Sequence, residues 1–168
     1  MFSIRASLPT DHDGVAALYR AVAASEGGLA RSADEITDAY VEEFLQRVAD
    51  GGLGLVAVDQ ARRIIGEIHA YRLEPRVFGH ILSDLTIAVA PDRQGSGVGR
   101  ALFAEFLRRV ELERPEVLRV ELIARESNAR AIAFYETLGF CIEGRLERRI
   151  RGANGRLEAD IVMGWLRP

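Results

Sequence analysis

The segment Arg93–Arg100 constrains the fold of this chain more than any other part of the sequence. It lies between a run typical of a β-strand, residues 85–89, and a run typical of an amphipathic helix, residues 98–112. Its glycines occupy every second position: Gly95, Gly97 and Gly99. Glycine leaves the backbone unshielded, and free N–H groups converge with the positive end of the helix dipole where a loop enters a helix. The segment therefore predicts a strand–loop–helix unit that binds a phosphate group.

Two common nucleotide-binding motifs fit this loop poorly. A Walker loop needs a lysine followed by serine or threonine after its last glycine, whereas Arg100 and Ala101 follow Gly99. A dinucleotide fingerprint reads G-x-G-x-x-G, whereas this loop reads G-x-G-x-G. It also needs an acidic residue after a second strand, and the acid near that distance, Glu121, lies inside a strand-like run. The spacing argues against both nucleotide sites and leaves the identity of the phosphate open.

Length and composition are those of one globular domain. With 168 residues, 48% of them apolar and 28% charged, we expect a single domain over residues 1–168. A net charge of −3 gives no general reason to expect a nucleic acid or a membrane as partner. No apolar run approaches the roughly 20 residues that span a bilayer, and the N-terminus lacks the pattern of a signal peptide. Cys141 is the only cysteine, so we expect a buried thiol in a cytoplasmic protein.

Hydrophobic periodicity and breaker residues predict the element order β-α-α-β-β-β-α-β-α-β-β. Strands are expected at residues 4–7, 53–59, 63–73, 80–89, 117–124, 140–151 and 156–166. The first helix should be capped by Thr10 or Asp11, and the others should cover about 33–49, 98–112 and 129–138. Residues 153–155 should form the last turn, and no linker or repeat divides the chain. The order predicts an α+β fold with a mixed sheet.

This order, with the glycine loop after the fourth strand, resembles the GCN5-related N-acetyltransferase (GNAT) superfamily. The cofactor loop of that family reads Gln/Arg-x-x-Gly-x-Gly/Ala, and residues 94–99 match every fixed position. A second family pattern, N-x-x-A-x-x-x-Y-x-x-x-G-F, matches residues 128–140, with Asn128 and Tyr135 in fixed places. The resemblance covers nearly the whole chain. It implies a mostly antiparallel sheet of about seven strands flanked by about four helices, with the fourth and fifth strands splayed to admit acetyl-CoA.

The resemblance implies that acetyl-CoA is the co-substrate and that its pyrophosphate lies on the glycine loop. The residues expected to hold it are Gln94, Gly95, Ser96, Gly97, Val98, Gly99 and Arg100. An anion at such a helix start gains about 0.3–1 kcal/mol from the dipole alone. In the family, free backbone groups of the fourth strand pair with pantetheine and polarise the thioester carbonyl, and these map to Ile87, Ala88 and Val89.

Asn128 and Tyr135 are seven residues apart, so a helix places them on one face about 10.5 Å apart along its axis. That spacing suits a pantetheine arm that passes one residue and ends with its sulfur near the other. The resemblance makes Tyr135 the general acid for the departing CoA thiolate. A helix cap is a second role for Asn128, and packing beside Phe134 is the alternative role for Tyr135.

The residue that takes the proton from the attacking amine is less evident. An amine with a pKa of about 10.4 is mostly protonated at pH 7, so a base or a proton-relaying water is expected. Many family members place a glutamate where this chain has Ser83, which is a poor base. We expect Glu67 and Asp84 to share the role, although strand alternation turns Asp84 to the opposite face unless a bulge intervenes. Solvated surface charges are the alternative for both carboxylates, and structural or solvent roles are the alternative for His69 and His80.

The sequence thus predicts an acetyl-CoA-dependent N-acetyltransferase in which a primary amine of a small molecule or peptide attacks the thioester. A non-catalytic acyl-CoA sensor and an NTP-dependent transferase are the alternatives. The histidines and the cysteine lack metal-ligand spacing, so no metal is expected. The resemblance also allows a homodimer through the C-terminal hairpin, with Trp165 either an anchor of that interface or a core residue.

Overall fold

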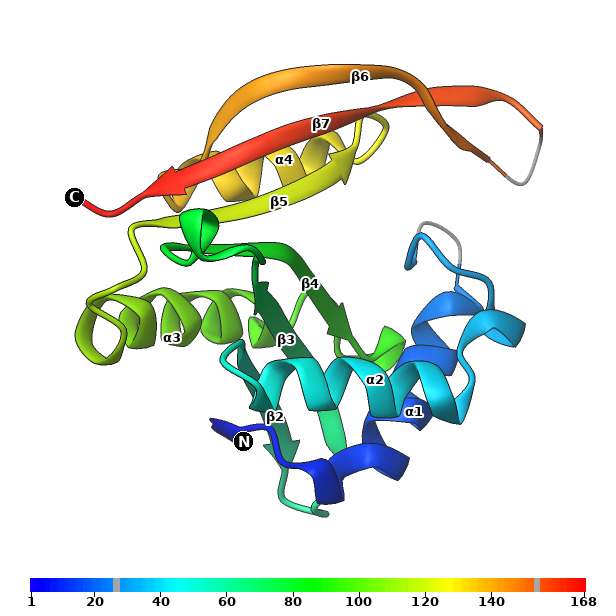
Figure 1. The fold of residues 1–168 in the computed structure, drawn as a ribbon. Helices are drawn as coiled ribbons and strands as arrows, with labels where there is room; N and C mark the ends of the chain where they lie inside the picture. The colour runs from blue at the N-terminus through cyan, green and yellow to red at the C-terminus, as the bar shows by residue number, and fades with distance from the viewer. Residues whose placement is uncertain (26–27, 153–154) are drawn as a thin grey trace.

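The computed structural model describes residues 1–25, 28–152 and 155–168. Seven strands form one mixed sheet in the order β1-β2-β3-β4-β5-β7-β6 (Figure 1). The strands are β1 (Phe2–Ala6), β2 (Leu53–Asp59), β3 (Ile64–Arg72), β4 (Ile81–Val89), β5 (Arg119–Arg125), β6 (Cys141–Arg151) and β7 (Leu157–Leu166). The α-helices are α1 (His12–Ala23), α2 (Asp38–Ala49), α3 (Val98–Glu113) and α4 (Ala129–Thr137). The predicted α+β fold with its mixed sheet is confirmed.

β4 and β5 are the parallel neighbours in a sheet whose other pairings are antiparallel. The two strands are joined by α3, as a parallel connection requires. They pair only at Ile81 with Arg119 and at Leu82 with Val120. Beyond these pairs the strands diverge, as Figure 1 shows, and we call the region between them the wedge. The splay that the family resemblance implied is therefore present.

Helices cover both faces of the sheet, and neighbouring residues of β3 show which helix lies on which face. A Cβ added at Gly66 would meet Leu102 Cδ1 of α3 at 2.8 Å, so Gly66 faces α3 and its small size admits that helix. The next residue, Glu67, contacts Tyr19 of α1. We call these two sides the α3 face and the α1–α2 face. Because strand residues alternate, every second residue of β3 looks toward α1 and α2.

α2 begins later than the sequence predicted. Ser32 caps only the short 3₁₀ turn Ala33–Glu35, and Ile36 then leaves the helical region with ψ at 73°. Thr37 starts the α-helix, because its side-chain hydroxyl accepts a hydrogen bond from the Tyr40 N–H at 3.1 Å. Two capping residues thus follow one another, and the second fixes the start of α2.

Three further expectations are corrected or decided by the fold. Cys141 is exposed, not buried, because it opens the edge strand β6 while its neighbour Phe140 points into the core. Trp165 is 5% exposed and packs beside Gly139, so its core role holds within this chain. Asp11 gives α1 no side-chain cap, since its carboxylate accepts hydrogen bonds from Arg5 instead.

Gly155 has φ at 77°, as a turn glycine would, but residues 153 and 154 of the predicted turn lie outside the described residues. Within the part of the chain that the structure describes, none of the helices combines the length and the apolarity needed to cross a bilayer.

We expect the substitution Thr37→Ala to lower the free energy of unfolding by about 0.5–2 kcal/mol, because it removes the cap of α2. Thr10→Ala is the matched control, since Thr10 is exposed and lies in the 3₁₀ turn before α1. Urea denaturation of both variants measures the difference. Equal stability of the two variants would contradict the assignment of Thr37 as the start of α2.

Candidate active site

The glycine loop lies between the end of β4 and the start of α3. Gly95 has φ at 75° and Gly97 has φ at 88°, so both occupy the left-handed region that favours glycine. Gly99 differs, because it lies in the first turn of α3 with ordinary helical backbone. A Cβ there would meet Val89 Cγ2 at an ordinary 3.5 Å. The first two glycines are thus required by the backbone, whereas the fold itself would accept a larger residue at 99.

The start of α3 carries unused backbone donors. Its N-cap is Gly97, which has no side chain to cap the helix, and the first turn contains no acidic residue. The first helical hydrogen bond runs from the Ala101 N–H to the Gly97 carbonyl at 3.0 Å. The N–H groups of residues 98–100 therefore lack acceptors within the helix. Residues 94–97 are exposed, so the predicted phosphate-binding residues are brought together at a site open to solvent.

β4 has a free backbone edge beside this loop. Residues 87–89 pair with residues 66–68 of β3, and the pairing with β5 has already ended at Leu82. Ile87 and Val89 lie on the α3 face, next to Gly99. Main-chain groups on the β5 side of this segment therefore face the wedge. This edge can accept an extended, amide-bearing chain in the way a sheet accepts another strand.

α4 contributes the second predicted motif. Asn128 is its N-cap, because its side-chain oxygen accepts a hydrogen bond from the Ala131 N–H at 3.3 Å, so the predicted capping role is confirmed. The Tyr135 ring packs on Phe103 with centroids 5.3 Å apart. Burial raises the pKa of the Tyr135 phenol, which keeps the hydroxyl protonated at neutral pH. The Arg100 guanidinium stands 5.6 Å from the Phe134 ring, which links the loop to this helix.

A β-bulge lies close to the point where β4 leaves β5. His69 pairs with Thr86 and Tyr71 pairs with Ser83, so two residues of β4 oppose the single residue Ala70 of β3. Asp84 is in the bulge, with φ at 56° and an exposed side chain. A bulge re-aims the side chains it contains, so the alternation rule does not apply at this position. The bulge that would free Asp84 from the alternation of the strand is therefore present.

Ser83, the neighbour of Asp84, contacts Glu121 of β5, a residue that sequence reasoning did not assign to the site. The Ser83 hydroxyl donates a hydrogen bond to Glu121 Oε2 of β5 at 3.0 Å. Glu121 Oε1 accepts from the Arg119 Nε–H at 2.6 Å. These three side chains join the two strands just where they part. The alternation of charged residues with Val120 and Leu122 in β5 was the signal that could have revealed them.

Glu67 is fully buried, so its interpretation as a solvated surface charge is wrong. It accepts a hydrogen bond from the Tyr19 hydroxyl at 2.6 Å, and His69 Nδ1 lies 3.0 Å from the same oxygen. The Tyr71 hydroxyl lies 2.9 Å from His69 Nε2. Desolvation raises the pKa of Tyr71, and the charges of Glu67 and Asp84 raise it further. Four polar side chains on the α1–α2 face thus satisfy one another, with Asp84 near the outer end.

His80 is placed apart from this group. Its side chain is exposed, and its backbone carbonyl accepts hydrogen bonds from the N–H groups of Leu118 and Arg119. The predicted solvent role fits this position at the start of β4.

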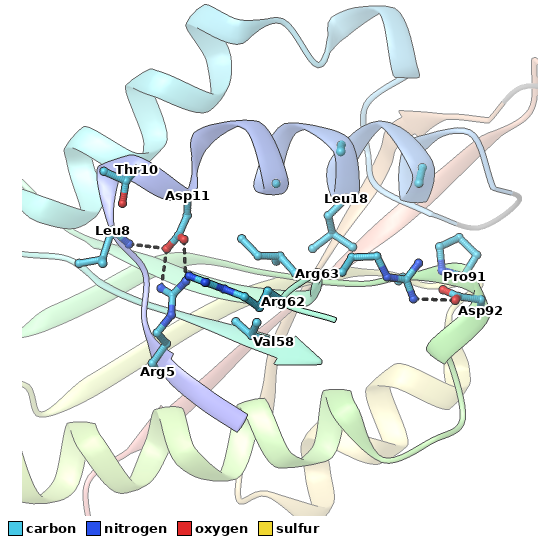
Figure 2. A pocket seen from close by; sticks show the side chains of 15 residues that line it. Arg5, Leu8, Thr10, Asp11, Leu18, Val58, Arg62, Arg63, Pro91 and Asp92 are labelled. Atoms are coloured by element: carbon cyan, nitrogen blue, oxygen red, sulfur yellow. Dashed lines mark hydrogen bonds and ion pairs between the residues drawn. The ribbon is translucent and has the colours of Figure 1, made fainter. Parts of the chain in front are cut away.

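A separate cavity of about 770 Å³ lies between α1, the β2–β3 turn and the segment before the glycine loop. Figure 2 shows two ion pairs in its wall, Arg5 with Asp11 and Arg63 with Asp92, each at 2.7 Å. Leu18 forms part of its apolar surface. The residues predicted to bind acetyl-CoA are not among those that line it. The wedge and this cavity are therefore distinct features of the molecule.

Comparison with known families agrees with this geometry. The family model described as acetyltransferase (GNAT) domain matches residues 50–142. That span contains the free edge of β4, the glycine loop, Asn128 and Tyr135. The chain belongs to the GNAT acetyltransferase family.

Individual relatives and solved structures give a more detailed picture. The [ribosomal protein bS18]-alanine N-acetyltransferase of Escherichia coli K12 is 52% identical over 77 residues, which is 46% of this chain and 50% of that protein. The chain thus matches about half the length of this curated relative. A GNAT-family acetyltransferase from Streptococcus pneumoniae has a TM-score of 0.88 at 24% identity, over 99% of this chain and 100% of that one. A phosphinothricin acetyltransferase from Sinorhizobium meliloti, solved with AcCoA, has a TM-score of 0.83 at 20% identity, over 98% and 88% of the two chains. These two structures share the fold.

Proposed function

We propose that this chain, acting as one domain over residues 1–168, is an acetyl-CoA-dependent N-acetyltransferase in which a primary amine attacks the thioester directly. The observation that carries the proposal is the meeting of three features: the wedge between β4 and β5, the free edge of residues 87–89, and the uncapped start of α3. An extended carrier arm fits the edge, and a pyrophosphate fits the helix start. The neighbour solved with AcCoA supports the same co-substrate.

The chain's own residues supply binding and proton transfer. The N–H groups of residues 94–100 hold the pyrophosphate, with Arg100 adding a positive charge, and Ile87, Ala88 and Val89 align the arm. Bound in this way, acetyl-CoA supplies an acetyl group already activated as a thioester. Tyr135 donates a proton to the departing thiolate, because its raised pKa keeps the phenol protonated until that charge develops.

Two carboxylates serve the attacking amine in different ways. Asp84 is exposed at the bulge and attracts the ammonium form of the acceptor. Glu67 is fully buried and cannot touch a substrate, so it acts only through the side chains bonded to it. This division replaces the simpler expectation of two equivalent bases.

A peptide α-amine is the acceptor class that the comparisons favour. The Escherichia coli relative acts, by its name, on an alanine of ribosomal protein bS18. An α-amine has a pKa of about 7.7–8.0, so it gives up its proton more easily than a lysine side chain at about 10.4. A cytoplasmic location suits such an acceptor. The small-molecule alternative is represented by the phosphinothricin acetyltransferase.

Release of CoA thiol from acetyl-CoA in the presence of peptide and small-molecule amines tests the activity. An enzyme releases thiol at a rate that depends on the amine, whereas a sensor binds CoA and releases none. Stabilisation by ATP instead of CoA in thermal unfolding would favour the NTP-dependent alternative. CoA at 100 times its Kd should add about 2.7 kcal/mol of apparent stability.

We expect Gly99→Asp to separate CoA affinity from stability. The fold has room for the side chain, and an acid in the first turn of a helix is stabilising, so the melting temperature should stay equal or rise. The same charge repels the pyrophosphate, so CoA affinity measured by calorimetry should fall by about tenfold or more. Gly144→Asp on β6 is the matched control, because a Cβ there meets nothing within 4 Å. Unchanged CoA affinity in Gly99→Asp would disprove the phosphate site.

We expect Tyr135→Phe to lower kcat by about 10²-fold while the affinity for acetyl-CoA changes little. The phenylalanine ring keeps the packing on Phe103, so only the proton donor is lost. Steady-state kinetics and calorimetry with acetyl-CoA measure the two quantities. A kcat equal to that of the wild type would remove Tyr135 from the reaction.

A further inference from the structure

The buried side chains on β3 form a continuous path of hydrogen bonds. With Glu67 ionised, both of its oxygens only accept, which places the hydrogen shared with His69 on Nδ1. His69 Nε2 is then an acceptor, and the Tyr71 hydroxyl donates to it at 2.9 Å. Glu67 is 0%, His69 1% and Tyr71 7% exposed, so the small exposed fraction lies at the tyrosine end. The path runs from a tyrosine near the surface to a carboxylate in the core.

The outer end of this path lies beside the wedge. Tyr71 is the cross-strand partner of Ser83, so their side chains are neighbours on the α1–α2 face. Ser83 hydrogen-bonds to Glu121 where β4 and β5 part. Asp84 follows Ser83 in the bulge and is close enough to influence Tyr71 electrostatically. Tyr71 therefore lies between the buried histidine and the point where β4 and β5 part.

We propose that Tyr71, His69 and Glu67 form a proton relay that takes the proton from the acceptor amine, with His69 as the group that receives it. This inference rests on the proposed N-acetyltransferase function. His69 Nε2 is the atom that the Tyr71 hydroxyl meets at 2.9 Å, so the geometry makes it the site that receives the proton. A carboxylate at the bulge is suited to hold an ammonium ion, whereas a histidine is suited to deprotonate it.

The transfer is balanced without any further reactant. Before attack, an ammonium proton passes to the Tyr71 oxygen while the Tyr71 proton passes to His69 Nε2, so the phenol is never ionised. The neutral amine nitrogen then forms the C–N bond as the C–S bond of the thioester breaks. Tyr135 gives its proton to the thiolate, and the second proton of the attacking nitrogen, lost as the amide forms, restores the Tyr135 phenol. His69 returns its proton to solvent through Tyr71, so the products are the amide, the CoA thiol and one proton.

The groups around His69 fit this role. From α1, Tyr19 hydrogen-bonds to Glu67. From α2, the Phe44 ring stacks on the imidazole at 4.6 Å between centroids, and the Arg47 guanidinium lies 3.7 Å above the Tyr71 ring. Tyr40 of α2 and Asp84 of β4 complete the titratable groups that act on Tyr71. Arg47 is the cation of this set and lies over Tyr71, away from the Glu67 end.

Two tyrosine variants test the relay with a matched pair. Tyr71→Phe cuts the path between the acceptor and His69, whereas Tyr40→Phe removes a neighbouring hydroxyl of α2 that is hydrogen-bonded to Arg31 and leaves the path intact. We expect kcat/KM at pH 7 to fall by about 10²-fold in Tyr71→Phe and by no more than about threefold in Tyr40→Phe. The deficit of Tyr71→Phe should shrink as the pH rises to about 9.5, because the amine is then neutral without help. Acetyl-CoA affinity, measured by calorimetry, should stay unchanged in both variants.

Glu67→Gln is the second variant, because it keeps the shape of the side chain and removes its charge. We expect a loss of rate at pH 7 that recovers at high pH in the same way. Equal losses in the two tyrosine variants, or losses that do not change with pH, mean that the network is only structural and overturn the relay. Wild-type protein that binds CoA but releases no thiol with any amine overturns the proposed function itself, and the relay with it.

Discussion

The parting of β4 from β5 after two residue pairs is the constraint on which the site depends. α3 leaves the end of β4 and packs against β3, where Gly66 lets Leu102 approach closely. β5 is held on its other side by a long antiparallel pairing with β7. β4 is therefore held by β3 and β5 by β7, so the two strands diverge after their two shared pairs. The free edge of β4 results from this division of the sheet, and it leads directly to the start of α3, which Gly97 leaves uncapped.

Features that depend on a few adjacent residues could be predicted from the sequence. Gly95 and Gly97 lie in the loop that leads into α3, as predicted, and Asn128 caps α4 as its position before the helix indicated. The strand and helix order was likewise readable, because each element repeats apolar residues at its own period. The start of α2 was misplaced, since Ser32 and Thr37 both carry a capping signal and only the fold shows which one begins the helix.

Features that depend on distant residues could not be predicted in this way. The direction of Asp84 follows from a bulge, which is a mismatch in length between β3 and β4 and leaves no mark on alternation. Glu67 meets Tyr19, which is 48 residues away, so its burial required knowledge of where α1 packs. One signal was available. Three polar side chains at alternate positions of an otherwise apolar strand, Glu67, His69 and Tyr71, can be buried only if they satisfy one another.

The two carboxylates of the α1–α2 face show how one surface can serve two purposes. Asp84 is held in water by a left-handed backbone position, where its side chain is accessible to an acceptor. Glu67 is held in the core by two donors, where its charge is inaccessible but acts at short range on His69. Removing either donor would leave part of a buried charge unsatisfied, which is costly. The same hydrogen bonds that attach α1 to the sheet therefore also orient the histidine, so the packing of α1 and the proton chemistry of the site are coupled.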